Sequence, residues 1–267
     1  MLYYKEYKQN KHKEWVVFVH GAGGSSSIWY RQLRHFRQRF NVLLVDLRGH
    51  GRSKDLLEDF VKSRYTFRDI AVDLLEVINH LNIRKAHYVG VSMGTIIIRT
   101  LGEIAPQHLK SMILCGAVTR LNIRSRVLVF LGHSVKRFVP YMWLYRLFAW
   151  IIIPNPKDSF SRNLFIREAR KLYKKEFLKW FRLTHEVNPL LKYFKEKEID
   201  VPTLYVMGDR DYMFLPPVEK IVEEHRYAML RVVEDCGHVC NIEKPELFNR
   251  VAIRFIRHNA TMLPQPM

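Results

Sequence analysis

The stretch Gly90-Val91-Ser92-Met93-Gly94 constrains this chain most, because an apolar run ends just before it and a helical pattern begins just after it. A Gly-x-Ser-x-Gly between a strand and a helix is typical of a sharp, strained turn that lifts the serine hydroxyl clear of the sheet edge. Glycines are needed on either side of the serine because strand and helix pack too closely there for side chains. This context predicts a nucleophilic Ser92 at the end of a strand.

Short apolar runs alternate with helical patterns along most of the chain. Predicted strands cover residues 15–20, 41–46, 85–91, 109–115, 203–207 and 229–233, and predicted helices cover residues 28–39, 66–81 and 243–258. Runs of this length, rich in Val, Leu and Ile, are typical of strands buried on both faces of a parallel sheet. The alternation predicts an α/β fold with a mostly parallel sheet flanked by helices.

The alternation stops between residues 121 and 198, where a mostly helical segment rich in aromatic residues intervenes. We expect residues 1–120 and 199–267 to form the core, and residues 121–198 to form a cap inserted between two strands. Open α/β sheets bind ligands beyond the carboxyl ends of their strands, and the cap is expected to lie there. The segment has 17 Lys or Arg against 6 Asp or Glu, so it carries 11 of the formal net charge of +18.

The positive charge favours an anionic substrate, a membrane surface or nucleic acid as a partner. Nucleic acid is the least favoured, because none of the usual binding motifs appears and the basic residues are scattered among the aromatic residues of the cap. The apolar-looking region 127–153 is interrupted by His, Lys and Arg, so no transmembrane span is predicted. An odd number of cysteines and a charged N-terminal segment predict a cytoplasmic protein.

A serine hydroxyl reacts at neutral pH only when a base and an orienting acid accompany it. Asp211 follows the predicted strand 203–207, and His238 follows the predicted strand 229–233. The carboxyl ends of parallel strands meet at one edge of a sheet, so both residues are candidates for the edge that holds Ser92. The order Ser, Asp, His is also the one expected for this turn.

Two backbone N–H groups are candidates for an oxyanion hole, which stabilises the negative charge of a tetrahedral intermediate. Met93 directly follows the nucleophile, and Ala22 lies in a glycine-rich loop after the first core strand. Cys236 and Cys240 flank His238, but two cysteines and one histidine this close together do not match the spacing of zinc ligands. Neither a metal nor a cofactor is predicted.

Five motifs together resemble the α/β-hydrolase fold family over nearly the full length of the chain. They are HGAGGS at 20–25, DLRGHGRS at 46–53, GVSMG at 90–94, GDRD at 208–211, and GH at 237–238 followed by EKP at 243–245. The resemblance implies that Ser92 is the nucleophile, that His238 acts first as general base and then as acid, and that Asp211 rather than Asp209 orients it. His20 and His50 would shape loops, and Thr95 departs from the glycine commoner in relatives.

The resemblance implies a hydrolase, specifically a carboxylesterase that cleaves an ester or related acyl bond of a small molecule through an acyl-enzyme. The basic, aromatic cap favours an anionic or lipid-like substrate and association with a membrane surface. Two alternatives remain open: a triad enzyme that performs elimination, like the menaquinone-pathway synthase of this family, and a non-enzymatic ligand receptor or partner-binding protein. The sequence does not predict the oligomeric state.

Overall fold

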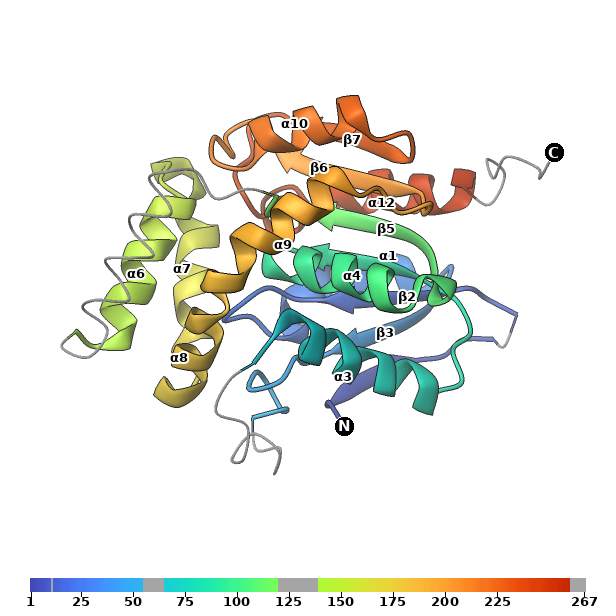
Figure 1. Ribbon diagram of the computed structural model, residues 1–267, viewed down its shortest axis with the longest axis horizontal. Coiled ribbons are helices and arrows are strands. Elements are labelled where there is room, and N and C mark those ends of the chain that lie inside the picture. The colour runs from blue at the N-terminus through green and yellow to red at the C-terminus, as the bar shows by residue number, and fades with distance from the viewer. Residues whose placement is uncertain (11, 55–64, 120–138, 260–267) are drawn as a thin grey trace.

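The computed structural model describes residues 1–10, 12–54, 65–119 and 139–259. The described residues form a seven-stranded sheet with helices on both faces (Figure 1). Its strand order is β1-β3-β2-β4-β5-β6-β7, and every neighbouring pair is parallel except β1 with β3. The predicted α/β fold with a mostly parallel sheet is therefore confirmed.

Six of the strands lie within one residue of the predicted runs. The strands are β1 (Tyr4–Tyr7), β2 (Trp15–Val19), β3 (Asn41–Val45), β4 (Ala86–Val91), β5 (Leu109–Cys115), β6 (Thr203–Gly208) and β7 (Ala228–Val233). Strand β1 was not predicted. It lies at the edge of the sheet and is only partly buried, so its sequence lacks the apolar run that marks the inner strands.

The core helices pack on the two faces of the sheet, and each face has its own cluster of buried apolar residues. One cluster includes residues of α3 (Phe67–His80), α4 (Met93–Ile104) and α10 (Leu215–Glu224), and the other includes residues of α1 (Tyr30–Arg37), α11 (Cys240–Glu243) and α12 (Pro245–Asn259). Short 3-10 turns are η1 (Ser26–Trp29), η2 (Pro106–His108) and η3 (Pro156–Asp158). The Thr66 hydroxyl and the Asp69 carboxylate form a capping box at the start of α3.

Four further helices, here called the cap helices, come between β5 and β6 in the chain. They are α6 (Tyr141–Ile152), α7 (Ser159–Ala169), α8 (Lys174–Arg182) and α9 (Thr184–Glu196). Figure 1 shows α6, α7 and α8 beyond one end of the sheet, with α6 farthest from it. Residues 121–138 of the predicted cap lie outside the described residues, so the division into core and cap stays a prediction. No described helix is both long and apolar enough to cross a bilayer.

Candidate active site

Ser92 lies in a tight turn between β4 and α4, and its backbone has φ +53°. Residues other than glycine rarely adopt this backbone conformation, so the turn is strained. A Cβ at Gly90 would lie 3.0 Å from the backbone carbonyl of Gly94 and 2.6 Å from Ile98 Cδ1, and a Cβ at Gly94 would lie 2.5 Å from the Val19 carbonyl oxygen. These contacts are too short, which is the physical reason for the two glycines that flank the serine.

The side chains of Ser92, His238 and Asp211 form a continuous hydrogen-bonded row. His238 Nε2 lies 3.0 Å from Ser92 Oγ, and His238 Nδ1 lies 2.7 Å from Asp211 Oδ2. Because a carboxylate can only accept, Nδ1–H of a neutral ring donates to Asp211 and Nε2 is left to accept from the serine hydroxyl. His238 and Asp211 are each 2% exposed, so the base and the acid are shielded from bulk water, whereas Ser92 is half-buried and faces the pocket.

Asp209 and Asp211 have different surroundings although they lie two residues apart. The Asp209 carboxylate accepts hydrogen bonds of 3.0 Å from the backbone N–H groups of Asp235 and Cys236. Asp209 therefore holds the loop that leads to His238, whereas Asp211 binds the ring itself. Phe214 packs against the His238 ring with a centroid separation of 5.1 Å, which limits movement of the imidazole.

The two candidate oxyanion donors, Ala22 and Met93, line the same pocket as Ser92. Among the described residues, neither backbone N–H has a hydrogen-bond partner. A Cβ at Gly21 would lie 3.1 Å from Ser92 Cβ, so the absence of a side chain lets the loop that carries Ala22 approach the serine. Both N–H groups are thus available beside the serine hydroxyl.

Two buried histidines hold the glycine loop on either side of Ala22. His20 Nδ1–H donates to the Gly21 carbonyl over 2.7 Å, and His50 Nε2 accepts from the Gly23 N–H over 2.8 Å. The remaining ring nitrogens bind the loop that follows β3, where His20 accepts from Leu47 N and His50 donates to the Arg48 carbonyl. The structure thus places both histidines where the sequence predicted a loop-shaping role.

These acceptor roles require both rings to be neutral. Burial lowers the pKa of His50 to about 3, with a smaller contribution from the neighbouring His20 ring. Burial also lowers the pKa of His20. The two rings therefore stay uncharged at neutral pH, and the loop keeps its hydrogen bonds there.

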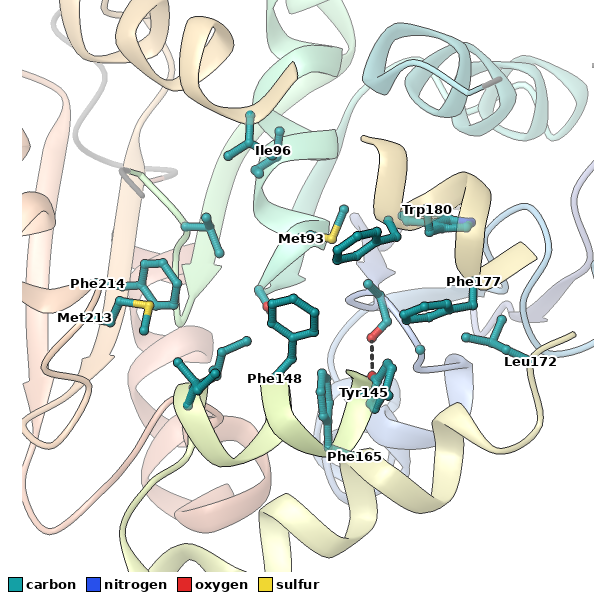
Figure 2. A pocket seen from close by; sticks show the side chains of 18 residues that line it. Met93, Ile96, Tyr145, Phe148, Phe165, Leu172, Phe177, Trp180, Met213 and Phe214 are labelled. Atoms are coloured by element: carbon teal, nitrogen blue, oxygen red, sulfur yellow. Dashed lines mark hydrogen bonds between the residues drawn. The ribbon is translucent and has the colours of Figure 1, made fainter. Parts of the chain in front are cut away.

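Tyr145 also holds the glycine loop, a role that no sequence pattern indicated. Its hydroxyl donates to the Ala22 carbonyl over 3.1 Å, drawn as a dashed line in Figure 2. The ring packs against Phe165 and Phe177 at centroid separations of 4.8 and 6.1 Å. A Cβ at Gly23 would lie 2.1 Å from the Tyr145 hydroxyl, so this glycine leaves the space that the tyrosine fills. A residue of α6 thus fixes the peptide next to a candidate oxyanion donor.

A pocket extends from Ser92 between the core and the cap helices (Figure 2). Its space, including the opening to solvent, amounts to about 1070 Å³. Figure 2 shows Met93 and Ile96 of α4 on one side and the rings of Phe148, Phe165 and Phe177 from the cap helices on another. The other described lining residues are Ala22, Gly23, Val118, Tyr145, Ile151, Ile152, Leu172, Trp180, Phe181, Val187, Met213 and Phe214.

None of the described lining residues carries a charged side chain. Two lysines of the cap instead bind buried carboxylates three residues before them in the chain. Lys171 binds Glu168, and Lys179 binds Glu176.

The three cysteines are buried and have free thiols behind the His238 loop. Hydrogen bonds with Cys115 and Cys236, together with burial, hold the pKa of the Cys240 thiol well above its usual value. A protonated, buried thiol is a poor nucleophile and a poor metal ligand. Among the described residues, no group of three His, Cys, Asp or Glu side chains could hold a metal ion.

Comparison with known proteins gives the family. A model of the alpha/beta hydrolase fold matches residues 14–139. The putative carbamate hydrolase RutD of Acinetobacter baylyi is 37% identical to this chain, over 95% of the chain and 98% of its own length. The chain belongs to the α/β-hydrolase fold family. Its relatives thus confirm the family that the five motifs indicated.

Other proteins similar to this α/β hydrolase have names that refer to other activities. The 3-oxoadipate enol-lactonase 1 of A. baylyi is 23% identical over 91% of this chain and 88% of its own length. Among solved structures, MenH from S. aureus has a TM-score of 0.80 at 18% identity and covers 97% of this chain and 100% of its own. The enol-lactonase from Burkholderia xenovorans has a TM-score of 0.78 at 20% identity, with 96% of each chain covered. These structures share the fold.

Proposed function

We propose that this α/β hydrolase cleaves a carboxylic ester or a related acyl bond through an acyl-enzyme on Ser92, and that its substrate has an apolar acyl group. One observation carries the proposal: the row Asp211–His238–Ser92, with contacts of 2.7 and 3.0 Å, ends at a pocket whose described lining residues carry no charge. The row supplies an activated nucleophile, and the pocket supplies a place for an apolar chain beside it.

In the proposed reaction, His238 Nε2 takes the proton of Ser92 while Oγ attacks the substrate carbonyl carbon. Asp211 keeps the ring oriented and stabilises the imidazolium that forms. The imidazolium then donates its proton to the leaving oxygen, sulfur or nitrogen, and the acyl-enzyme remains. A water molecule then attacks the acyl carbon as it loses a proton to His238. The imidazolium returns this proton to Ser92 Oγ as the bond between the acyl carbon and Oγ breaks and the carboxylic acid leaves.

The negative charge on the tetrahedral intermediate is proposed to be stabilised by the N–H groups of Ala22 and Met93. Both lack another partner among the described residues. Ala22 lies on the glycine loop that His50 and Tyr145 hold, and Met93 is the first residue of helix α4, so both donors are in place before the substrate arrives. Removal of one such donor in hydrolases costs about 2.7–4 kcal/mol of transition-state stabilisation. Preorganisation is effective because the donors need no rearrangement during the reaction.

The named relatives suggest which bonds belong in a substrate panel. One relative is an enol-lactonase and another a putative carbamate hydrolase, so lactones and carbamates accompany linear esters. The panel should vary the acyl chain of p-nitrophenyl esters from acetate to decanoate. We expect kcat/KM to rise as the acyl chain lengthens until it fills the pocket, because each buried methylene contributes about 0.8 kcal/mol.

Ser92→Ala tests the mechanism. Loss of a serine nucleophile lowers kcat by roughly 10⁶ in enzymes of this type. We expect a fluorophosphonate to label the native protein and not the variant, and mass spectrometry to detect an acylated Ser92 during turnover. Unchanged turnover in Ser92→Ala would overturn the assignment. A protein that is labelled but never accumulates an acyl-enzyme with any substrate would instead support the elimination alternative.

A further inference from the structure

Helix α6 presents large apolar side chains on two opposite faces. One face is turned toward the pocket and carries Tyr145, Phe148 and Ile152. The opposite face carries Trp143, Leu147 and Trp150, spaced by four and then three residues, so the three lie in one stripe. They are 66%, 50% and 53% exposed. A surface helix ordinarily places polar residues on this side.

The exposed stripe has little cover among the described residues. Arg146 lies between Trp143 and Trp150 on the same side of the helix and is itself exposed. The guanidinium of Arg162 lies 3.5 Å from the centre of the Trp150 ring and holds that ring in place. Figure 1 shows α6 as the helix farthest from the sheet, so the stripe lies at one end of the molecule's long axis. Tryptophan and arginine on one outward face are typical of a helix that lies in the interface of a membrane.

A cluster of positive charge lies beside the first turn of this helix. The Tyr141 hydroxyl donates to the Leu172 carbonyl over 3.2 Å, which joins the start of α6 to the connector between α7 and α8. Five basic residues on and around this connector are exposed: Arg167, Arg170, Lys171, Lys174 and Lys175. The acidic residues among them, Glu168 and Glu176, are 6% and 0% exposed. The connector therefore presents mainly positive charge to the outside.

We propose that the stripe Trp143–Leu147–Trp150 and the basic connector together dock on the surface of an anionic phospholipid bilayer. The apolar rings would enter the boundary between headgroups and acyl chains, and the connector would bind acidic headgroups. The net charge of the predicted cap, +11, has the sign that this partner requires. The proposal rests on exposure and charge alone and does not depend on the proposed reaction.

Vesicle co-sedimentation tests the docking surface with the full chain. Vesicles of phosphatidylcholine containing about 30% phosphatidylserine represent an anionic membrane, and pure phosphatidylcholine vesicles are the comparison. We expect binding to the anionic vesicles, weaker binding at high salt, and a blue shift of tryptophan emission on binding. The double variant W143S/L147S should bind roughly tenfold less or weaker still, because it removes two inserted side chains. R170E/K174E should lose about fivefold for each basic side chain replaced.

Matched variants elsewhere on the surface distinguish binding through the proposed site from nonspecific adsorption to vesicles. Met229→Ser removes a side chain that is 54% exposed on β7, and K220E/R231E reverses two exposed charges on α10 and β7, outside the stripe and the basic connector. Both should leave vesicle binding within twofold of the native protein, and every variant should hydrolyse a dissolved short-chain ester at the native rate. Loss of that activity would concern the proposed function alone.

Three results would overturn the proposal. The first is absence of binding to anionic vesicles, and the second is binding that W143S/L147S leaves unchanged. The third is a concentration-dependent dimer in analytical ultracentrifugation that W143S/L147S abolishes, because the stripe would then be an interface between two copies of this chain.

Discussion

The loops of the core around Ser92 and the cap helices above them are held by different kinds of interaction. In the core, directional hydrogen bonds fix each polar group, as the contacts of His238 with Ser92 and Asp211 show. In the cap, rings pack on rings, as Phe177 does on Phe181 at a centroid separation of 5.7 Å. Few other side chains can replace a member of the hydrogen-bonded row, whereas one apolar side chain can often replace another in ring packing. We therefore expect core substitutions to change the rate and cap substitutions to change which substrate is preferred.

The strongest test of the core is Asp211→Asn, which keeps the shape of the side chain and removes its charge. An asparagine favours the wrong tautomer of His238, and kcat should fall by about 10⁴ with KM little changed. Steady-state kinetics on the preferred ester measures the fall, with the thermal unfolding temperature as a check on folding. A fall of less than tenfold would mean that another group orients His238.

The matching test of the cap is Phe148→Ala, which enlarges the pocket. The ratio of kcat/KM for decanoate over butanoate esters should rise by roughly 30-fold, because two or three more methylenes can be buried. Labelling of Ser92 by a small fluorophosphonate should keep its native rate. Leu147→Ala, on the opposite face of the same helix, is the control and should leave the ratio unchanged. If Phe148→Ala lowers the rate on every ester alike, the comparison between core and cap fails.

Tyr145 lies where the two regions meet, so it sharpens the comparison. Tyr145→Phe keeps the ring and removes the hydrogen bond to the Ala22 carbonyl. We expect kcat to fall by about fivefold and KM to change little, since a net hydrogen bond is worth about 1 kcal/mol and the oxyanion interaction acts in the transition state. Affinity for a boronic acid that mimics the tetrahedral intermediate should fall in parallel.

Tyr141→Phe supplies the control for that experiment. It removes a hydroxyl from the same helix, one turn earlier, where the partner is the Leu172 carbonyl rather than the glycine loop. Native kinetics in this variant would show that loss of a cap hydrogen bond has no general effect. Equal losses of kcat in both variants would contradict a specific role for Tyr145.

The smallest effect at neutral pH is expected from His50. Its pKa is 6.5 when unfolded and about 3 when folded, so the unfolded chain takes up a proton first as the pH falls. The stability that depends on the neutral ring is complete above pH 6.5 and is lost below it by about 1.4 kcal/mol per pH unit. His50→Gln should flatten the pH dependence of unfolding by about one proton. Equal slopes in His50→Gln and the native protein would refute the assignment.

The sequence predicted most of the core because the features there follow local patterns. The two glycines lie two residues before and two residues after Ser92, although the contact that requires Gly94 comes from Val19 of the neighbouring strand β2. Asp211 and His238 follow strand ends, so sheet topology brings them together. The edge strand β1 was not predicted, because its half-buried tyrosines and its charged residues do not form an apolar run.

For the cap, the sequence predicted only the composition and the mostly helical character of the segment. Its positive charge was visible, but the direction of each side chain was not, so the sequence could not show that no described lining residue is charged. Tyr145 illustrates the limit. It belongs to an apolar helix, and its partner Ala22 is 123 residues away, a pairing that no local pattern encodes.

The contact between Tyr145 and the glycine loop has a consequence for protein engineering. The cap helices look exchangeable, since they come between strands β5 and β6 in the chain. The Tyr145 hydroxyl nevertheless binds the Ala22 carbonyl, and its ring fills the space left by Gly23. We expect a transplanted cap that lacks this tyrosine to slow the reaction as well as change the substrate, so a chimera should keep Tyr145 along with the new pocket.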